Sequence, residues 1–174
     1  MLIAHLSKRS ETSYARRSVS ESISETARKS RDPWWRRIQS CPVRRTRESL
    51  KAYGVDDRCS VVEGNFFKSA PGGADTYLFR HIIHDWTDEQ SVQILNNCRK
   101  VIPNNGRLLI IEAVVPSGNE PSLAKDFDMV MLTFPGGVER TEEEYRFLLE
   151  RAGFQLNSIT PTAAVVSVVE GKPI

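Results

Sequence analysis

The stretch ADTYLFRHIIHDWTDEQSVQILNNCRKVIPNNGRLLIIEAVV, residues 74–115, decides the fold of this chain of 174 residues. Residues 74–79 follow a Pro-Gly-Gly loop and have the composition of a short strand. Thr87 and Gln90 form a capping box, which predicts a helix whose apolar face is Val92, Leu95, Cys98 and Ile102. Residues 107–115 are an apolar, β-branched run that suits a central strand covered on both faces. Strand, helix and strand in succession predict an α/β fold.

The segments on either side of this stretch continue the alternation of helices and strands. We predict a helix end closed by Gly54, a short strand at residues 59–64, a helix at 126–132, a helix that a second capping box opens at Thr141 and that Gly153 closes, and two final strands at 154–160 and 163–170. The helix after Thr141 has one apolar face, made by Tyr145, Leu148, Leu149 and Ala152. These elements form an α/β layered design that ends in a strand pair.

Charge divides the chain near residue 48. Residues 1–47 contain twelve Lys and Arg against four Asp and Glu, whereas residues 48–174 contain twelve against eighteen. The first segment is rich in Ser and Arg and has no sustained apolar period, so we expect it to be disordered or only locally helical. The sequence therefore predicts a basic segment, 1–47, joined to a folded domain, 48–174.

Two functions of the basic segment compete with that of a solvated tail. Its first nine residues are basic, apolar and serine-bearing, as in a mitochondrial presequence, but Glu11, Glu21 and Glu25 argue against one. A nucleic-acid-binding tail is disfavoured because Trp34 and Trp35 are its only clustered aromatic residues. We favour a solvated basic tail, or a segment that was not originally part of the folded domain.

Composition also bears on membranes, cysteines and compartment. No apolar run approaches the ~20 residues that cross a bilayer. Cys41, Cys59 and Cys98 are scattered without the spacing of a zinc site or a disulfide framework. The chain is therefore expected in a reducing compartment, the cytoplasm.

One histidine and two glutamates are expected to meet beyond the carboxyl ends of the strands. His84 follows the first strand of the opening stretch, Glu112 lies near the end of the next, and Glu139 precedes the helix that begins at Thr141. Open parallel sheets bind ligands at this edge. Such a set suits proton removal from a phenol, with His84 as general base and the carboxylates as its supports.

Other roles for these residues remain open from the residues alone. His84 next to Asp85 could be an ordinary hydrogen-bonded loop residue. The pattern of His81, His84 and Asp85 could suggest a metal site, but no third ligand follows at a spacing typical of a zinc motif, which argues against one. Glu139 could simply complement the helix N-terminus that follows it.

Several short motifs, taken together and in order, resemble one enzyme family. They are Asp57-Arg58-Cys59, Gly64-Asn65-Phe66-Phe67, Arg80 through Trp86, Ile111-Glu112, Glu139-Arg140-Thr141-Glu142, Ala152-Gly153-Phe154 and Pro161-Thr162. From about Glu48 to Pro173 the chain is similar to the C-terminal portion of the cofactor domain of S-adenosylmethionine-dependent O-methyltransferases. This group includes the caffeic acid and hydroxyindole O-methyltransferases.

The resemblance implies a reaction, a cofactor and a site. It implies methyl transfer from S-adenosylmethionine to a hydroxyl of a small aromatic or polyketide-like acceptor in secondary metabolism. His84 matches the family's general base, and Glu112 and Glu139 match the two acidic residues that flank it. Cofactor-binding positions are matched by Gly64, Asn65, Phe66 and Arg80. Met129, Met131, Leu132 and Phe134 are expected to line a helix near the acceptor pocket and favour an apolar, flat acceptor, although ordinary core packing explains them at least as well.

The chain departs from the family at its cofactor loop. Asn65 stands where the family usually has Asp, and no glycine-rich strand-to-helix turn precedes the matching region, since the first glycine is Gly54. We therefore expect a partial Rossmann-like sheet with flanking helices that lacks the first strands and the glycine-rich loop. Those strands would lie between the strands predicted at residues 59–64 and 74–79, so their absence would leave an open edge.

Two functional hypotheses follow from the resemblance and the departure. The first is an O-methyltransferase with His84 as base. The second is a truncated, catalytically inactive remnant that acts as an interaction module, as a homo-oligomer or by pairing its open edge with an intact homologue.

Overall fold

The computed structural model describes residues 42–133 and 136–174, which fall into two compact units, residues 42–58 and Cys59–Ile174. The smaller unit consists of helix α3, Pro42–Ala52, and the turns after it. Gly54 has φ +61° and its N–H donates to the Lys51 carbonyl, so the predicted glycine-closed helix end is confirmed. Residues 42–47 of the basic segment belong to α3, and the rest of that segment, 1–41, lies outside the described residues.

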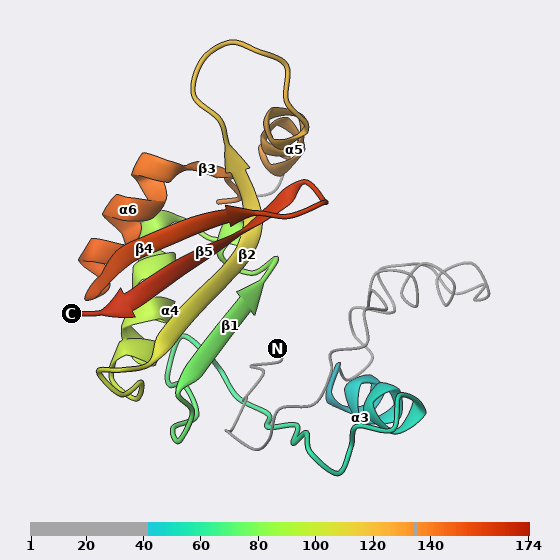
Figure 1. Cartoon of the computed structure of the whole chain (residues 1–174). Helices are drawn as coiled ribbons and strands as arrows, with labels where there is room; N and C mark the ends of the chain where they lie inside the picture. Colours follow the sequence, from blue (N-terminus) through green and yellow to red (C-terminus); the bar gives the residue numbers. More distant parts are fainter. Residues whose placement is uncertain (1–41, 134–135) are drawn as a thin grey trace. The chain divides into compact units, whose positions relative to one another are not determined.

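The larger unit is a mixed sheet with flanking helices (Figure 1). Its elements in chain order are β1 Thr76–Arg80, the 3₁₀ helix η1 Ile83–Asp85, α4 Asp88–Arg99, β2 Arg107–Val115, α5 Leu123–Met131, β3 Arg140–Thr141, α6 Glu142–Arg151, β4 Phe154–Pro161 and β5 Val166–Pro173. The α/β architecture is the predicted one. Among the described residues, no helix has the length and hydropathy needed to cross a membrane.

The sheet has the order β1-β2-β5-β4, with β3 paired to the end of β2. β1 and β2 are parallel, with Leu78 opposite Leu109, whereas β5 runs antiparallel to both β2 and β4. β3 lies parallel to β2, with Val114 opposite Arg140. The interior strand β2 therefore touches every other part of the sheet except β4.

Both predicted capping boxes are present. At the start of α4 the Gln90 N–H donates to Thr87 Oγ1 and the Thr87 N–H donates to Gln90 Oε1. At the start of α6 the Thr141 N–H donates to a Glu144 carboxylate oxygen over 2.7 Å. Each box satisfies two N–H groups that a helix start otherwise leaves unpaired.

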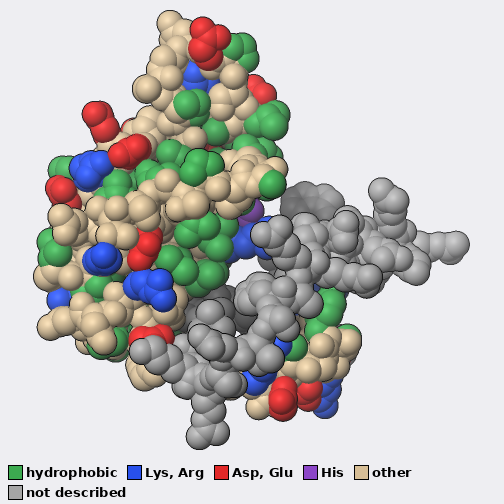
Figure 2. Space-filling view, in the orientation of Figure 1, with side chains coloured by type: hydrophobic (Ala, Val, Ile, Leu, Met, Phe, Trp, Pro, Cys, Tyr) green, Lys and Arg blue, Asp and Glu red, His purple; other side chains and the backbone are tan. Residues whose placement is uncertain are grey.

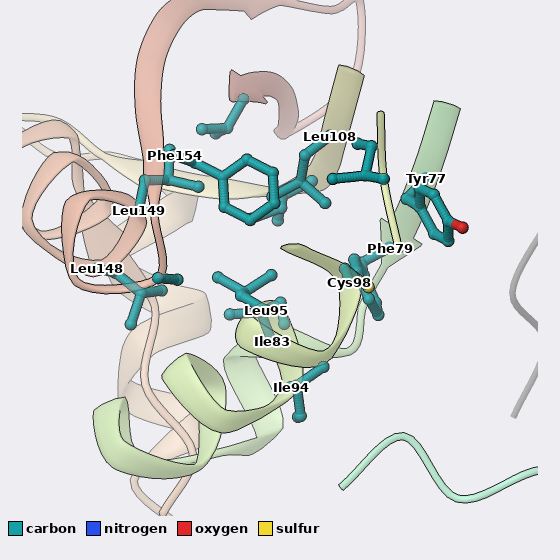
Figure 3. Packing of buried hydrophobic residues seen from close by; sticks show 14 of the residues in the cluster. Tyr77, Phe79, Ile83, Ile94, Leu95, Cys98, Leu108, Leu148, Leu149 and Phe154 are labelled. Atoms are coloured by element: carbon teal, nitrogen blue, oxygen red, sulfur yellow. The ribbon is translucent and has the colours of Figure 1, made fainter. Parts of the chain in front are cut away.

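The core lies between one face of the sheet and helices α4 and α6. Leu95 and Cys98 of α4 and Leu148 and Leu149 of α6 point toward the strands (Figure 3). The strand side chains that meet them include Tyr77, Phe79, Leu108, Ile110, Phe154 and Val169, all at most 2% exposed. The apolar faces predicted for these two helices are therefore the faces that they bury.

The opposite face of the sheet carries a half-buried apolar row made by Leu78, Leu109, Ile111 and Val168. In Figure 1 both α4 and α6 lie behind the sheet, and Figure 2 shows hydrophobic side chains gathered over the face that is turned to the viewer. The run Arg107–Val115 has the composition of a strand covered on both faces, yet α4 and α6 cover only one of them.

The strand predicted at residues 59–64 is wrong, because these residues have no regular secondary structure. A strand needs a partner for its backbone groups, and none of the described strands pairs with this segment.

Other boundaries shift by a few residues. α5 begins at Leu123, earlier than expected, because Ser122 caps it, and β5 begins at Val166 because Thr162 Oγ1 holds the preceding turn.

Gly106 gives a test of the packing between α4 and β2. A Cβ at this position would lie 2.6 Å from Ile102 Cγ1 and 2.9 Å from the carbonyl oxygens of Asp75 and Pro103. We expect Gly106→Ala to lower the free energy of unfolding by ~1–3 kcal/mol, measured by denaturant titration. Gly72→Ala is the control, because its Cβ would lie 3.8 Å from Val101 Cβ, an ordinary contact. Equal stabilities of the two variants would contradict the packing described.

Candidate active site

His84 lies in η1, just beyond the carboxyl end of β1, as the sequence predicts. Its side chain is 13% exposed, so the ring is largely enclosed but still reaches the surface. The backbone N–H of Val138 donates to the His84 carbonyl over 2.8 Å. This bond ties η1 to the segment that leads into β3 and carries Glu139.

Glu139 is the carboxylate that contacts the histidine. Its Oε1 lies 2.8 Å from His84 Nδ1, and the Glu139 side chain is only 2% exposed. Asp128 of α5 fixes Glu139 in turn, because its Oδ1 accepts the Glu139 N–H over 2.9 Å. The expected pair of imidazole and carboxylate is therefore formed between residues 55 positions apart.

Glu112 holds the backbone that carries His84 and makes no hydrogen bond to the imidazole. It is 0% exposed, and its Oε1 accepts the N–H groups of Ile82 and Ile83 over 3.0 and 2.7 Å. Its Oε2 accepts the hydroxyl of Tyr145 over 2.9 Å. Burial raises the pKa of Glu112, although these hydrogen bonds and His84 oppose the shift. Glu112 thus positions η1 from the side of its N–H groups.

Arg140 holds the same turn from the side of its carbonyls. The guanidinium is 1% exposed and donates to the carbonyl oxygens of Ile83 and Trp86 and to Asp88 Oδ1. Sequence reasoning placed Arg140 in a matching motif but gave it no role. The one signal in the sequence was its position directly after Glu139, next to the expected site. A buried arginine needs hydrogen-bond acceptors, and the structure shows which ones it has.

Tyr145 was assigned to the apolar face of its helix, and its hydroxyl has a further role. The side chain is 0% exposed and its hydroxyl is the donor to Glu112. A buried tyrosine normally finds a hydrogen-bond partner, which is the signal that could have identified it. Burial, together with the neighbouring Glu112 carboxylate, raises the pKa of Tyr145 well above its usual value.

The pKa of His84 is raised above its ordinary value. Burial lowers it, but the hydrogen bond to Glu139 and the charges of Glu112, Glu139 and Asp85 outweigh burial. His84 Nε2 lies 3.6 Å from Asp85 Oδ1, on the more exposed side of the ring. The site therefore favours the imidazolium that forms when His84 accepts a proton.

His81 lies against His84 in a strained backbone conformation. Its φ of +50° is the only positive value among the described residues other than glycine, and the two rings are 5.3 Å apart between centroids. Burial lowers the pKa of His81, and the neighbouring His84 and Arg80 lower it further. The two imidazoles thus titrate apart, with His84 the more basic of the pair.

The four residues predicted to bind the cofactor are not gathered into one described cavity. Gly64 and Asn65 are exposed, and Asn65 Oδ1 accepts the Phe67 N–H over 2.9 Å. Phe66 packs with Phe67 and Trp86, whereas Arg80 is exposed at the end of β1. One open groove lies elsewhere, beside α4, and is lined by Phe67, Lys68, Glu89, Val92, Gln93, Asn96, Asn97 and Lys100. It does not reach His84 and takes no part in the site.

Comparison with known proteins identifies the family. The sequence profile of the O-methyltransferase domain matches residues 42–155, well over half of the chain. The chain belongs to the O-methyltransferase domain family.

Within residues 42–133 and 136–174, no three His, Cys, Asp or Glu side chains come together in a way that could hold a metal ion.

Individual relatives agree with the family and show how much of it the chain spans. It is 45% identical over 125 residues to phenazine O-methyltransferase PhzM of Lysobacter antibioticus, and 45% identical over 105 residues to 3-amino-4-hydroxybenzoate 4-O-methyltransferase of Streptomyces cremeus. These matches cover 72% and 60% of this chain but only 37% and 29% of the relatives. The chain thus spans about a third of the length of these curated relatives.

Solved structures give the same result. The crystal structure of LaPhzM superposes with a TM-score of 0.72 at 42% identity, over 76% of this chain and 40% of that one. An O-methyltransferase from neocarzinostatin biosynthesis, solved with S-adenosylmethionine and 2-hydroxy-5-methyl naphthoic acid, superposes with a TM-score of 0.69 at 32% identity, over 78% and 39%. The partial Rossmann-like sheet expected from the sequence is therefore confirmed as part of a methyltransferase fold.

The Glu139–His84 pair predicts a pH-dependent stability. Because the folded pKa of His84 lies above its unfolded value near 6.5, the pair stabilises the fold fully below that pH and loses this effect as pH rises through the folded pKa. We expect Glu139→Gln to lower the His84 pKa, measured by NMR, and to reduce the free energy of unfolding most below pH 6.5. The control is Glu142→Gln, whose carboxylate is exposed and pairs only with Arg146 in the described contacts. An unchanged His84 pKa in the Glu139 variant would refute the pairing.

The backbone of His81 predicts an unusual preference among substitutions. Asn tolerates φ near +50°, whereas a β-branched residue does not, so His81→Val should be less stable than His81→Asn by ~1–2 kcal/mol. Thermal or denaturant unfolding measures the difference. The same two substitutions at Gln155, an exposed position of strand β4, should show the opposite order, because strands favour Val. The usual strand order at His81 would argue against the left-handed conformation.

Proposed function

We propose that this chain takes part in methyl transfer to a hydroxyl group of a small aromatic acceptor, with His84 as the general base. The observation that carries the proposal is the 2.8 Å contact between His84 Nδ1 and the buried carboxylate of Glu139. A carboxylate only accepts hydrogen bonds, so Nδ1 carries the proton of the neutral ring. Nε2 is then left with its lone pair, on the more exposed side of the ring.

The acceptor proton is expected to move to Nε2. A phenol with a pKa near 10 is mostly protonated at neutral pH and is a poor nucleophile in that form. Transfer of its proton to His84 as the oxygen attacks avoids a free phenolate, and Glu139 stabilises the imidazolium that results. The raised pKa of His84 strengthens the base but also requires a pH high enough to keep the ring neutral beforehand.

The cofactor side of the site is supported in part. S-adenosylmethionine would supply the methyl group, and Gly64, Asn65, Phe66 and Arg80 are the residues proposed to hold it. Next to Phe66 and Phe67 lies Trp86, whose buried Nε1 has no partner among the described residues. This orphaned donor in an aromatic cluster fits a flat ligand with an acceptor atom. The described residues include no glycine-rich turn, so Gly64, Asn65, Phe66 and Arg80 would form only part of a binding site for the cofactor.

The acceptor is proposed to be flat and apolar. Met129 of helix α5 is 67% exposed, and Leu132, the residue directly after the helix, is 68% exposed. Met131, by contrast, is buried. Phe134, the fourth residue expected there, lies outside the described residues. A hydroxylated aromatic ring suits the exposed pair, and relatives named for phenazine and for 3-amino-4-hydroxybenzoate support this class.

A second candidate function is a catalytically inactive interaction module. One observation favours it: the described residues include no glycine-rich turn that could hold the cofactor. Titration calorimetry of the full chain with S-adenosylhomocysteine separates the two candidates. Micromolar binding supports the enzyme, and no binding by a folded chain supports the module.

His84 gives the test of the chemistry. With S-adenosylmethionine and 3-amino-4-hydroxybenzoate as the acceptor probe, we expect His84→Ala to lower kcat by ~10²–10⁴-fold. Its affinity for S-adenosylhomocysteine should change less than about twofold, because a base acts in the transition state. Glu150→Gln, exposed on α6, is the control for handling of the protein. An equal fall in kcat and in cofactor affinity would overturn the role of base.

A further inference from the structure

Among the described residues, His84 is the only hydrogen-bond partner of the Glu139 carboxylate. Glu139 Oε1 lies 2.8 Å from Nδ1 of the ring, and Glu139 Oε2 is buried without a donor in the same part of the chain. No described hydrogen bond therefore holds the carboxylate from its other side. Its direction depends on the backbone at residue 139, so the groups that fix this backbone decide whether the carboxylate reaches the ring.

Two successive backbone N–H groups tie this segment to different elements. The Val138 N–H donates to the His84 carbonyl over 2.8 Å, and the Glu139 N–H donates to Asp128 Oδ1 over 2.9 Å. The first bond joins the segment to η1, the turn that carries the base. The second joins it to α5, and β3 begins only at the next residue, Arg140. Asp128 is therefore the side chain that fixes the direction of the Glu139 N–H.

Helix α5 is itself anchored, which gives Asp128 a defined position. Ser122 caps its first turn, because Ser122 Oγ accepts the Ala124 N–H over 3.2 Å. Ala124 and Met131, at the two ends of the helix, are buried. Figure 1 shows α5 near the carboxyl end of β2, a strand with which it is in contact. A bond from Asp128 thus connects Glu139 to a packed element.

Asp128 bonds the backbone of Glu139 and makes no described contact with the His84 ring. The ionisable groups that do lie around this ring belong to other elements, and they are Asp85 in η1, Glu112 in β2, Glu139 before β3 and His81 after β1. The three carboxylates raise the pKa of His84, whereas burial lowers it. An effect of Asp128 on the base would therefore pass through Glu139.

We propose that Asp128 is a positioning residue of the site: through its bond to the Glu139 N–H, helix α5 holds the Glu139 carboxylate against Nδ1 of His84. The role depends on the acceptor atom and not on the negative charge. Because Asn offers the same kind of acceptor oxygen, a neutral amide at this position should hold Glu139 as well as the carboxylate does.

The same face of α5 extends to the surface proposed for the acceptor. Leu132 follows Asp128 by four positions, a spacing that places two side chains on one face of a helix. The Leu132 N–H donates to the Asp128 carbonyl over 3.1 Å, and the Leu132 side chain is exposed. An acceptor ring that packs on Leu132 would lie one helical turn from the residue that holds Glu139. This link between the acceptor and the base rests on the proposed function.

Titration of the histidines by NMR tests the role of Asp128 in the full 174-residue chain, without cofactor or acceptor. Asp128→Ala should lower the His84 pKa toward its ordinary value near 6.5, because Glu139 is no longer held against the ring. Asp128→Asn should leave this pKa as it is in the unaltered chain. The matched control is Asp126→Ala, which removes an exposed carboxylate from the same helix and should also leave it unchanged.

A double variant shows whether the effect passes through Glu139. Glu139→Gln removes the carboxylate that Asp128 is inferred to hold, so Asp128→Ala added to it should change the His84 pKa little further. Each variant should still unfold cooperatively. If Asp128→Ala does not fold, Asp128→Leu takes its place, because it keeps a side chain branched at Cγ and removes the acceptor.

Three results would overturn the role of Asp128. They are a His84 pKa that Asp128→Ala leaves unchanged, a pKa that Asp128→Asn lowers as much as Asp128→Ala does, and an equal effect of Asp128→Ala with and without the Glu139 carboxylate. The second would assign the effect to charge, and the third to a general loosening of the fold.

Methyl-transfer kinetics, with the acceptor probe of the His84 test, extend the result to the reaction. Asp128→Ala should lower kcat at least about tenfold with little change in KM, whereas Leu132→Ala should mainly raise KM. A normal kcat in Asp128→Ala would overturn the positioning role in the reaction. A chain that transfers no methyl group, but whose His84 pKa follows the expected pattern, would refute the proposed function alone.

Discussion

The buried carboxylate of Glu112 is the constraint on which the rest of the larger unit depends. It sits in the interior strand β2, is fully enclosed, and accepts two backbone N–H groups after β1 and one hydroxyl from α6. Burial penalises its charge and raises its pKa, and three hydrogen bonds offset only part of that penalty. Removal of the carboxylate would leave those donors unpaired in the core, so β1, β2 and α6 depend on one another.

Arg140 completes this constraint with the opposite polarity. Glu112 fixes the N–H groups at the start of η1, and the buried guanidinium fixes carbonyls at Ile83 and Trp86. With its backbone held from both sides, the turn leaves His84 little freedom except rotation of its ring. Glu139 fixes that rotation, and Asp128 and β3 hold Glu139. Two buried charges of opposite sign therefore support the one imidazole that remains partly exposed.

Local signals in the sequence predicted most of the fold. The features that sequence reasoning missed depend on contacts between residues far apart in the chain. The capping boxes at Thr87 and Thr141 involve residues three positions apart, so the pattern alone identifies them. The strand expected at residues 59–64 needed a neighbour that its own sequence cannot supply. The contacts of Glu112 with Tyr145 and of Arg140 with Ile83 join residues 33 and 57 positions apart. Sequence order placed Glu112 near His84, but only the structure assigns it to the backbone.

The energetic cost of Glu139 bears on whether the site has a use. Glu112 and Arg140 are explained by the fold, because every described contact of theirs holds backbone or neighbouring side chains. Glu139 is buried, yet one of its carboxylate oxygens finds no hydrogen-bond donor among the described residues, and the other contacts only the ring of His84. A buried carboxylate with an unpaired oxygen destabilises a fold, and an apolar residue of similar size would avoid that cost. A module selected only for its shape has no need of this pair, whereas a base that must become an imidazolium does.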